Sequence, residues 1–159
     1  MALNLRQGDE VICCSHTMLA TASAIKVAGG IPIPVEIGYD NLIDPDAIEN
    51  AITSRTVGIM PTQLNGRTCD MERIMQIANK YKLYVVEDAA QALGSKFKGK
   101  NAGTFGHASA ISFFPAKVLG CFGDAGAILC QDDTIFDRAY QLHDHGRDKD
   151  GNVKSWGRN

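Results

Sequence analysis

Several features that define special classes of protein are missing from this sequence of 159 residues. No apolar stretch reaches the roughly 18 residues that a membrane-spanning helix needs, and charges stand near the amino terminus, where a signal peptide requires an apolar core. Lysine and arginine do not cluster, and 16 basic against 18 acidic side chains give a formal net charge of −2. We therefore expect a soluble, cytoplasmic protein without membrane or nucleic-acid partners.

The five cysteines do not form the pattern of a disulfide framework or a zinc site. Their number is odd and no C-x-x-C pair occurs, so we expect reduced thiols. His143 and His145 are two residues apart, and residues with this spacing point to different sides of a helix. We therefore expect no bound metal ion.

Short apolar runs rich in β-branched residues alternate with helical patterns along the whole chain. Such alternation is typical of the α/β class, in which crossover helices connect the strands of a parallel sheet. With 45% hydrophobic residues, a chain of this length can form one domain with its own core. We predict strands at residues 11–14, 31–37, 57–60, 83–86, 109–114 and 127–130, helices at residues 20–28 and 134–142, and a loop at residues 95–106.

Aspartate and proline mark several boundaries of these elements. Asp44 before Pro45, and Asp70 before an apolar pattern of helical period, predict the starts of two more helices, because an aspartate side chain can cap free N–H groups. Pro32 and Pro34 lack the N–H group that a central strand must donate. We therefore expect their strand at an edge of the sheet.

Two stretches contain residues suited to catalysis. Asp88 ends a predicted buried strand, and the small residues after it leave its carboxylate open to a cationic partner; alternatively, Asp88 caps a following helix. Lys117 stands alone among apolar and small residues after the strand at 109–114. A lysine that loses hydration there offers a neutral amine to a carbonyl carbon, as Schiff-base chemistry requires; alternatively, its stem lies along the loop and its ammonium group reaches water. Position alone leaves these alternatives open.

A set of motifs in a fixed order covers nearly the whole chain. They include residues 7–12 (QGDEVI), 20–22 (ATA), 70–71 (DM), 86–92 (VEDAAQA), 112–117 (SFFPAK), 123–127 (GDAGA), 145–146 (HG) and 157–159 (GRN). Together they resemble the DegT/DnrJ/StrS family of pyridoxal-phosphate-dependent sugar aminotransferases, which belong to fold type I. The resemblance implies a three-layer α/β/α large domain with a mostly parallel sheet, and pyridoxal 5'-phosphate as the cofactor.

By position, the resemblance assigns roles to individual residues. Lys117 corresponds to the lysine that binds the cofactor covalently and then moves protons between the cofactor and the substrate carbon. Asp88 corresponds to the acid that pairs with the pyridine nitrogen, whose protonation makes the cofactor an electron sink. Gln91 corresponds to a residue near the ring and its phenolic oxygen, and Ser112 to a hydroxyl donor to the phosphate.

Three further cofactor-binding positions follow from the resemblance. Thr17 is expected near the ring. Met18 occupies the position at which many members stack an aromatic residue on the ring, and its thioether packs there less rigidly. Asn159 corresponds to an asparagine that reaches the phosphate of the neighbouring subunit's cofactor, which implies a homodimer with shared active sites.

The resemblance also implies a reaction, the transfer of an amino group from an amino-acid donor, glutamate, to a keto group of a nucleotide-linked sugar. Residues 1–159 would be an incomplete cofactor-binding large domain, without the amino-terminal G-T-x-A-L segment and the carboxyl-terminal small domain of the family. The sequence QLNG at 63–66, where members often have HLYG, puts a substrate role for Gln63 or Asn65 in doubt.

Three alternatives stay open beside this hypothesis. A binding or regulatory domain without catalysis fits an incomplete chain. A sugar dehydratase of the same family would carry histidine in place of Lys117, so the lysine argues against it. A nicotinamide-dependent reductase is disfavoured because no G-x-G-x-x-G motif opens the first helix.

Overall fold

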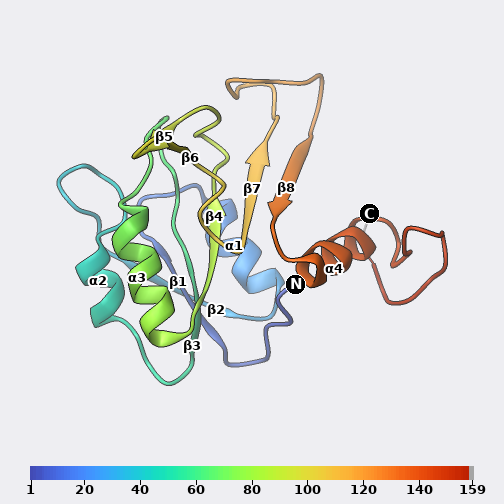
Figure 1. Cartoon of the computed structure of the whole chain (residues 1–159), viewed down its shortest axis with the longest axis horizontal. Coiled ribbons are helices and arrows are strands. Elements are labelled where there is room, and N and C mark those ends of the chain that lie inside the picture. Colours follow the sequence, from blue (N-terminus) through green and yellow to red (C-terminus); the bar gives the residue numbers. More distant parts are fainter. Residues whose placement is uncertain (158–159) are drawn as a thin grey trace.

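The computed structural model describes residues 1–157 and contains a six-stranded sheet with the strand order β2-β1-β3-β4-β7-β8 (Figure 1). The strands are β1 (Glu10–Cys14), β2 (Ile31–Val35), β3 (Thr56–Met60), β4 (Tyr84–Asp88), β7 (Ala108–Ser112) and β8 (Gly126–Cys130). All neighbouring pairs are parallel except β7 and β8, which are antiparallel. The predicted α/β class with a mostly parallel sheet is confirmed, and β2 with its two prolines lies at an edge as expected.

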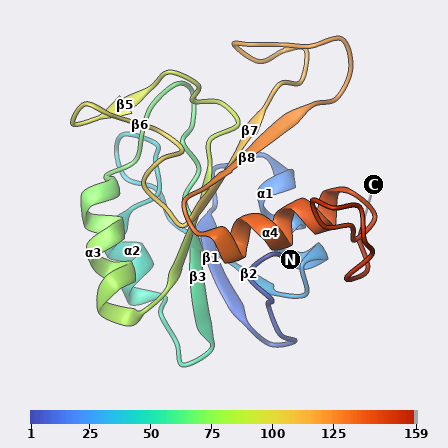
Figure 2. The same ribbon diagram turned by 45° about the vertical axis from the view of Figure 1, so that its right-hand side comes forward.

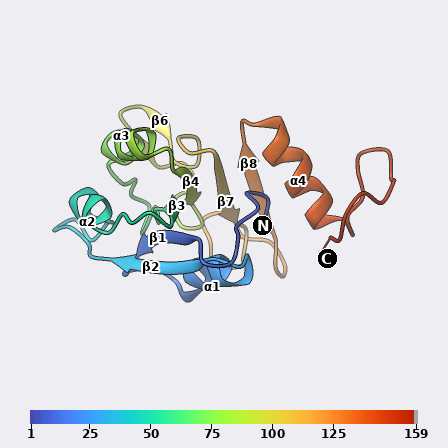
Figure 3. The ribbon, with the colours of Figure 1, turned by 90° about the horizontal axis from the view of Figure 1, so that it is seen from below.

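Helices lie on both faces of this sheet and make the three layers that the resemblance implied (Figure 3). The helices are α1 (Leu19–Val27), α2 (Pro45–Asn50), α3 (Met71–Tyr81) and α4 (Asp133–His143). The helices α2 and α3 pack together on one face, whereas α1 covers the other face and α4 packs against β8.

The core is divided between the two faces of the sheet. The larger part lies under α2 and α3, where Ile59, Ile74 and Val85 are fully buried. A smaller part lies under α1, where Ile25 packs with Val11 and other apolar residues. Because successive side chains of a strand point to opposite faces, β1 contributes to both parts, with Ile12 in the larger part and Val11 in the smaller one.

Side-chain caps start three of the helices. The carboxylate of Asp44 accepts a hydrogen bond from the backbone N–H of Asp46 at 2.9 Å, and Pro45 occupies the first turn of α2. Asp70 caps α3 in the same way through the N–H of Arg73 at 3.1 Å. Both predicted caps are confirmed. The side chain of Asp132 caps α4, which therefore begins slightly before the predicted residue 134.

The structure overturns one alternative that the sequence left open and differs from two of the predicted ranges. No helix follows Asp88 within residues 89–94, so this residue is not a helix cap; its carboxylate instead accepts from the N–H of Ala90 in a turn. The predicted loop at 95–106 contains a short antiparallel pair, β5 (Lys96–Phe97) and β6 (Lys100–Asn101). The strand predicted to reach residue 37 ends at Val35.

All five cysteines are free, as predicted. Burial raises the pKa of the Cys13 thiol to about 11 and that of Cys69 to about 12, which leaves little reactive thiolate at neutral pH.

In the part of the chain that the structure describes, no helix combines the length and the apolar character needed to cross a bilayer.

Candidate functional site

The carboxyl end of β4 carries two adjacent acids that point to opposite faces of the sheet. Glu87 lies on the side of α3 and is fully buried, with 0% of its surface exposed. Its carboxylate accepts hydrogen bonds from the backbone N–H groups of Gly103 (2.7 Å), Phe105 (2.6 Å) and Gly106 (2.8 Å), and from the side-chain amide of Gln63 (2.9 Å). Glu87 therefore fixes the loop 103–106 to the end of β4, and it has no access to a ligand.

Gln63 belongs to the same buried anchor. Its amide oxygen accepts from the backbone N–H of Cys69 at 2.7 Å, its amide nitrogen donates to Glu87, and the side chain has 0% exposure. A direct substrate contact by Gln63 does not fit this environment. Gln63 therefore has a structural role, which agrees with the doubt about its substrate role that the sequence raised.

Asp88 lies on the other side of the sheet, toward α1, and is half-buried. One carboxylate oxygen, Oδ2, accepts from the hydroxyl of Thr21 at 2.5 Å, and Oδ1 accepts from the N–H of Ala90 at 3.2 Å. No ion pair between side chains of residues 1–157 includes Asp88. A half-buried carboxylate with only neutral donors is suited to a cationic partner.

A row of threonine hydroxyls leads away from Asp88. Thr21 contacts Thr17 at 2.7 Å, and Thr17 contacts Thr62 at 2.8 Å. Thr21 and Thr62 each expose only 3% of their surface. The motifs of the sequence point to Thr17 but assign no role to Thr21 or Thr62. The four-residue spacing of Thr17 and Thr21 around the start of α1 is a usable signal for neighbouring side chains.

The other predicted cofactor residues lie in loops or at the ends of elements. Met18 directly precedes α1 and exposes 65% of its surface. Gln91, in the turn after β4, accepts a hydrogen bond from the N–H of Asn65 at 3.2 Å. Ser112 ends β7, and its hydroxyl oxygen accepts from the N–H of Phe114 at 3.2 Å, so its hydrogen is left to donate elsewhere. Asn159 lies outside the described residues.

Lys117 lies in the loop between β7 and β8, which extends beyond the rest of the sheet (Figure 2). The loop begins at the carboxyl end of β7, the parallel neighbour of β4, and Asp88 pairs in register with Ala110 of β7. Lys117 and Asp88 therefore belong to the same edge of the sheet, where ligands bind in open α/β folds. The lysine side chain is half-buried rather than buried, and it forms no ion pair with side chains of residues 1–157.

A close backbone approach shapes the Lys117 loop. A Cβ atom at Gly120 would lie 2.5 Å from the carbonyl oxygen of Pro115, which no side chain tolerates. The N–H of Cys121 also donates to the carbonyl of Phe113 at 2.8 Å and closes the turn. Glycine at position 120 is thus required for the tight path of the chain around Lys117.

Gly120→Ala should open this turn and displace Lys117, because the clash is with backbone and cannot be relieved by a rotamer change. We expect covalent labelling of Lys117 by pyridoxal phosphate and borohydride to fall at least roughly tenfold, as a displacement of about 1 Å can cost more than this in reactivity. Peptide mass spectrometry measures the label. Val153→Ala, which shortens an exposed side chain outside this loop, is the control, and equal labelling of the two variants would contradict the expectation.

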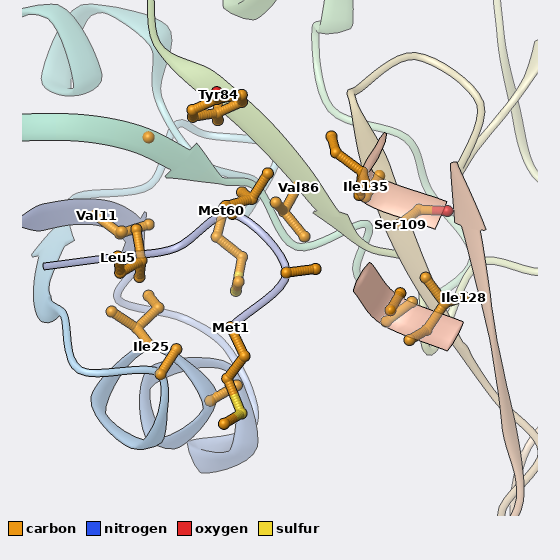
Figure 4. A pocket seen from close by; sticks show the side chains of 18 of the residues that line it. Met1, Leu5, Val11, Ile25, Met60, Tyr84, Val86, Ser109, Ile128 and Ile135 are labelled. Carbon is orange, nitrogen blue, oxygen red and sulfur yellow. The ribbon is translucent and has the colours of Figure 1, made fainter. Parts of the chain in front are cut away.

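One cavity of the described chain is separate from these residues. It has a volume of about 600 Å³ and lies between α1, α4 and the sheet, with Ile25, Met60 and Val86 among the apolar side chains around it (Figure 4). None of the six described site residues lines it. An apolar cavity of this kind lacks the polar groups that a phosphate or a sugar requires.

The family model for DegT/DnrJ/EryC1/StrS aminotransferases matches residues 1–159. The chain belongs to this family. A dTDP-3-amino-3,4,6-trideoxy-alpha-D-glucose transaminase of Streptomyces venezuelae is 41% identical over 145 residues, which are 91% of this chain and 38% of that protein. A 3-oxo-glucose-6-phosphate:glutamate aminotransferase of Bacillus subtilis is 43% identical over 147 residues, 92% of this chain and 32% of that protein.

Solved structures of the family show the same fold. NtdA of Bacillus subtilis with bound cofactor PMP matches with a TM-score of 0.90 and 40% identity, over 99% of this chain and 36% of that one. The chain spans about 40% of the length of the curated relatives it matches. Family membership and fold agree with the resemblance that the motifs indicated.

Proposed function

We propose that the protein is the cofactor-binding part of a pyridoxal-phosphate-dependent aminotransferase. It would transfer an amino group from an amino acid, glutamate, to a keto group of a nucleotide-linked sugar in the cytoplasm. The name of the Streptomyces relative supports a nucleotide-linked sugar, and the name of the Bacillus relative supports glutamate as the donor. The observation that carries the proposal is that Asp88, which is half-buried and forms no ion pair with the side chains of residues 1–157, lies at the same sheet edge as Lys117.

The donor set around Asp88 fits pyridoxal phosphate. Asp88 offers its carboxylate to the protonated ring nitrogen, a cation that the described side chains do not supply. Ser112 has a hydroxyl hydrogen left to donate to a phosphate oxygen. Gln91 would lie toward the phenolic oxygen, with Thr17 and Met18 near the ring. When bound, the cofactor supplies an electron sink for the carbanion that forms on the substrate.

Lys117 has two tasks in this proposal. Its amine would be the nucleophile that attaches the cofactor, and the same amine would accept a proton from the substrate carbon and return it. Both tasks need a side chain that reaches the site without being held in an ion pair. The absence of an ion pair at Lys117 among residues 1–157 satisfies this need.

A homodimer with shared sites is also part of the proposal. Exposed apolar side chains stand on the Lys117 loop, among them Val118, Leu119 and Phe122. Such a concentration of exposed apolar surface next to a site is typical of a surface that a partner covers. In the dimer, Asn159 would reach the phosphate of the partner's cofactor.

Covalent trapping tests the proposed function. The purified chain is mixed with pyridoxal phosphate and reduced with borohydride, and the labelled peptide is identified by mass spectrometry. We expect one stoichiometric label at Lys117 that is absent from Lys117→Ala, while Lys100→Ala, which changes another lysine of the chain, keeps it. Scattered or absent label in a folded sample would overturn the proposal and favour the alternative, a binding or regulatory domain.

A further inference from the structure

The hydroxyls of Thr62, Thr17 and Thr21 form a continuous chain that ends on Asp88. The oxygen–oxygen distances are 2.8 Å, 2.7 Å and 2.5 Å along this path. The three threonines come from different parts of the fold, since Thr62 follows β3, Thr17 precedes α1, and Thr21 lies inside α1. The chain of hydroxyls thus connects two neighbouring structural elements to the end of a third, β4.

The direction of these hydrogen bonds follows from the chemistry of the groups. An ionised carboxylate only accepts, so Thr21 donates its single hydroxyl hydrogen to Asp88. Thr21 must then accept from Thr17, and Thr17 must accept from Thr62. All three hydrogens point toward Asp88, and hydrogen bonds aligned in this way strengthen one another.

This arrangement holds the carboxylate from both sides. Thr21 binds Oδ2, and the backbone N–H of Ala90 binds Oδ1. Thr21 cannot turn away without losing its own bond to Thr17, and it is buried, so its rotamer is fixed by packing. Each oxygen of the Asp88 carboxylate is therefore held by one hydrogen bond.

We propose that Thr21, supported by Thr17 and Thr62, is a positioning residue for Asp88. It fixes the carboxylate in the one orientation that faces the bound ring, and thereby keeps the ring nitrogen protonated. The effect on the ring nitrogen rests on the proposed function, whereas the fixed orientation of the Asp88 carboxylate concerns the chain alone. Thr21 itself does not touch the cofactor in this proposal.

The first test needs no cofactor. In the isotopically labelled 159-residue chain, three-bond couplings from the backbone to the Asp88 carboxyl carbon report whether its side chain occupies one rotamer or several. We expect one rotamer in the wild type and in Thr21→Ser, which keeps the hydroxyl, and averaged couplings in Thr21→Val, which has nearly the same shape without it. Thr68→Val is the matched control, because it removes a hydroxyl pair of similar length, with Ser95 at 2.8 Å, away from Asp88.

The second test uses pyridoxal phosphate labelled with ¹⁵N in the ring. In Thr21→Val we expect the ring ¹⁵N signal to move toward that of the unprotonated ring, and the dissociation constant of the cofactor to rise roughly two- to tenfold, the range of one net hydrogen bond. Thr21→Ser should restore both values. If Thr21 had only a structural role, Thr21→Val would change the ring ¹⁵N signal and the dissociation constant no more than Thr68→Val does.

The outcomes separate this inference from the proposed function. Identical Asp88 couplings in Thr21→Val and the wild type would overturn the positioning role, whatever the cofactor does. Altered couplings with an unchanged ring ¹⁵N signal would overturn the effect on the ring. A wild-type chain that takes no label at Lys117 would overturn the proposed function and with it the effect on the ring, while the coupling result would still stand for Asp88.

Discussion

Replacing Glu87 by alanine is expected to cause the largest loss of stability of any single substitution discussed for this chain. Three backbone N–H groups and one side-chain amide would lose their acceptor inside the protein, and the removed side chain would leave a cavity. Unsatisfied buried donors and cavities each cost on the order of 1–3 kcal/mol, so the free energy of unfolding should fall by about 4 kcal/mol or more. That is a large fraction of the roughly 5–15 kcal/mol that stabilise a typical domain.

Urea denaturation measures this loss as a shift of the midpoint. Glu87→Gln keeps the shape but turns an amide N–H group toward the donors, so we expect a smaller loss of about 2–3 kcal/mol. Glu72→Gln is the matched control, because Glu72 is an exposed residue of α3 whose ion pair with Lys98 lies in solvent, and such pairs contribute little. A midpoint of Glu87→Ala equal to that of the Glu72 variant would contradict the anchoring role.

Asp88→Asn is expected to have the largest effect on cofactor binding that leaves the fold intact. Asparagine has nearly the same shape, and its single carbonyl oxygen can accept from only one of Thr21 and Ala90. It carries no charge to hold a protonated ring nitrogen. Hydrogen bonds between charged groups are about twice as strong as neutral ones, so the dissociation constant of pyridoxal phosphate should rise roughly ten- to hundredfold.

Absorbance titration with pyridoxal phosphate measures this constant directly. Asp70→Asn is the matched control: it makes the same chemical change at the cap of α3, where asparagine caps as well as aspartate. Unfolding midpoints of both variants show whether the fold is kept. An unchanged affinity in Asp88→Asn would mean that this carboxylate does not face the ring nitrogen.

Local signals in the sequence predicted most of the sheet and the helices correctly. Apolar runs gave the strands of the main sheet, and the caps at Asp44 and Asp70 gave the first residues of α2 and α3. These features depend on neighbours within a few residues, so a single sequence contains them. The edge position of β2 was also predictable, because its prolines exclude a central place.

Contacts between distant residues could not be predicted in the same way. Glu87 reads in the sequence as one half of an acidic pair, and its partners Gly103, Phe105 and Gly106 stand 16 to 19 residues away. Thr62 meets Thr17 across 45 residues. The sequence left open whether a helix or a turn follows Asp88, because aspartate is equally favoured in both settings. Roles for the remaining site residues, Asn159 included, stay predictions.

Glu87 and Asp88 point to opposite faces of the sheet, and the hydrogen bonds of Glu87 therefore favour one alignment of β4 with its neighbours. A shift of β4 by one residue would exchange the faces of its side chains, placing Asp88 among the N–H groups of the loop and Glu87 against α1. The longer side chain reaches four donors only in the native alignment. A chain that folds with β4 correctly aligned therefore places Asp88 on the face toward α1, so that correct folding of this strand also sets the position of the acid proposed to bind the ring nitrogen.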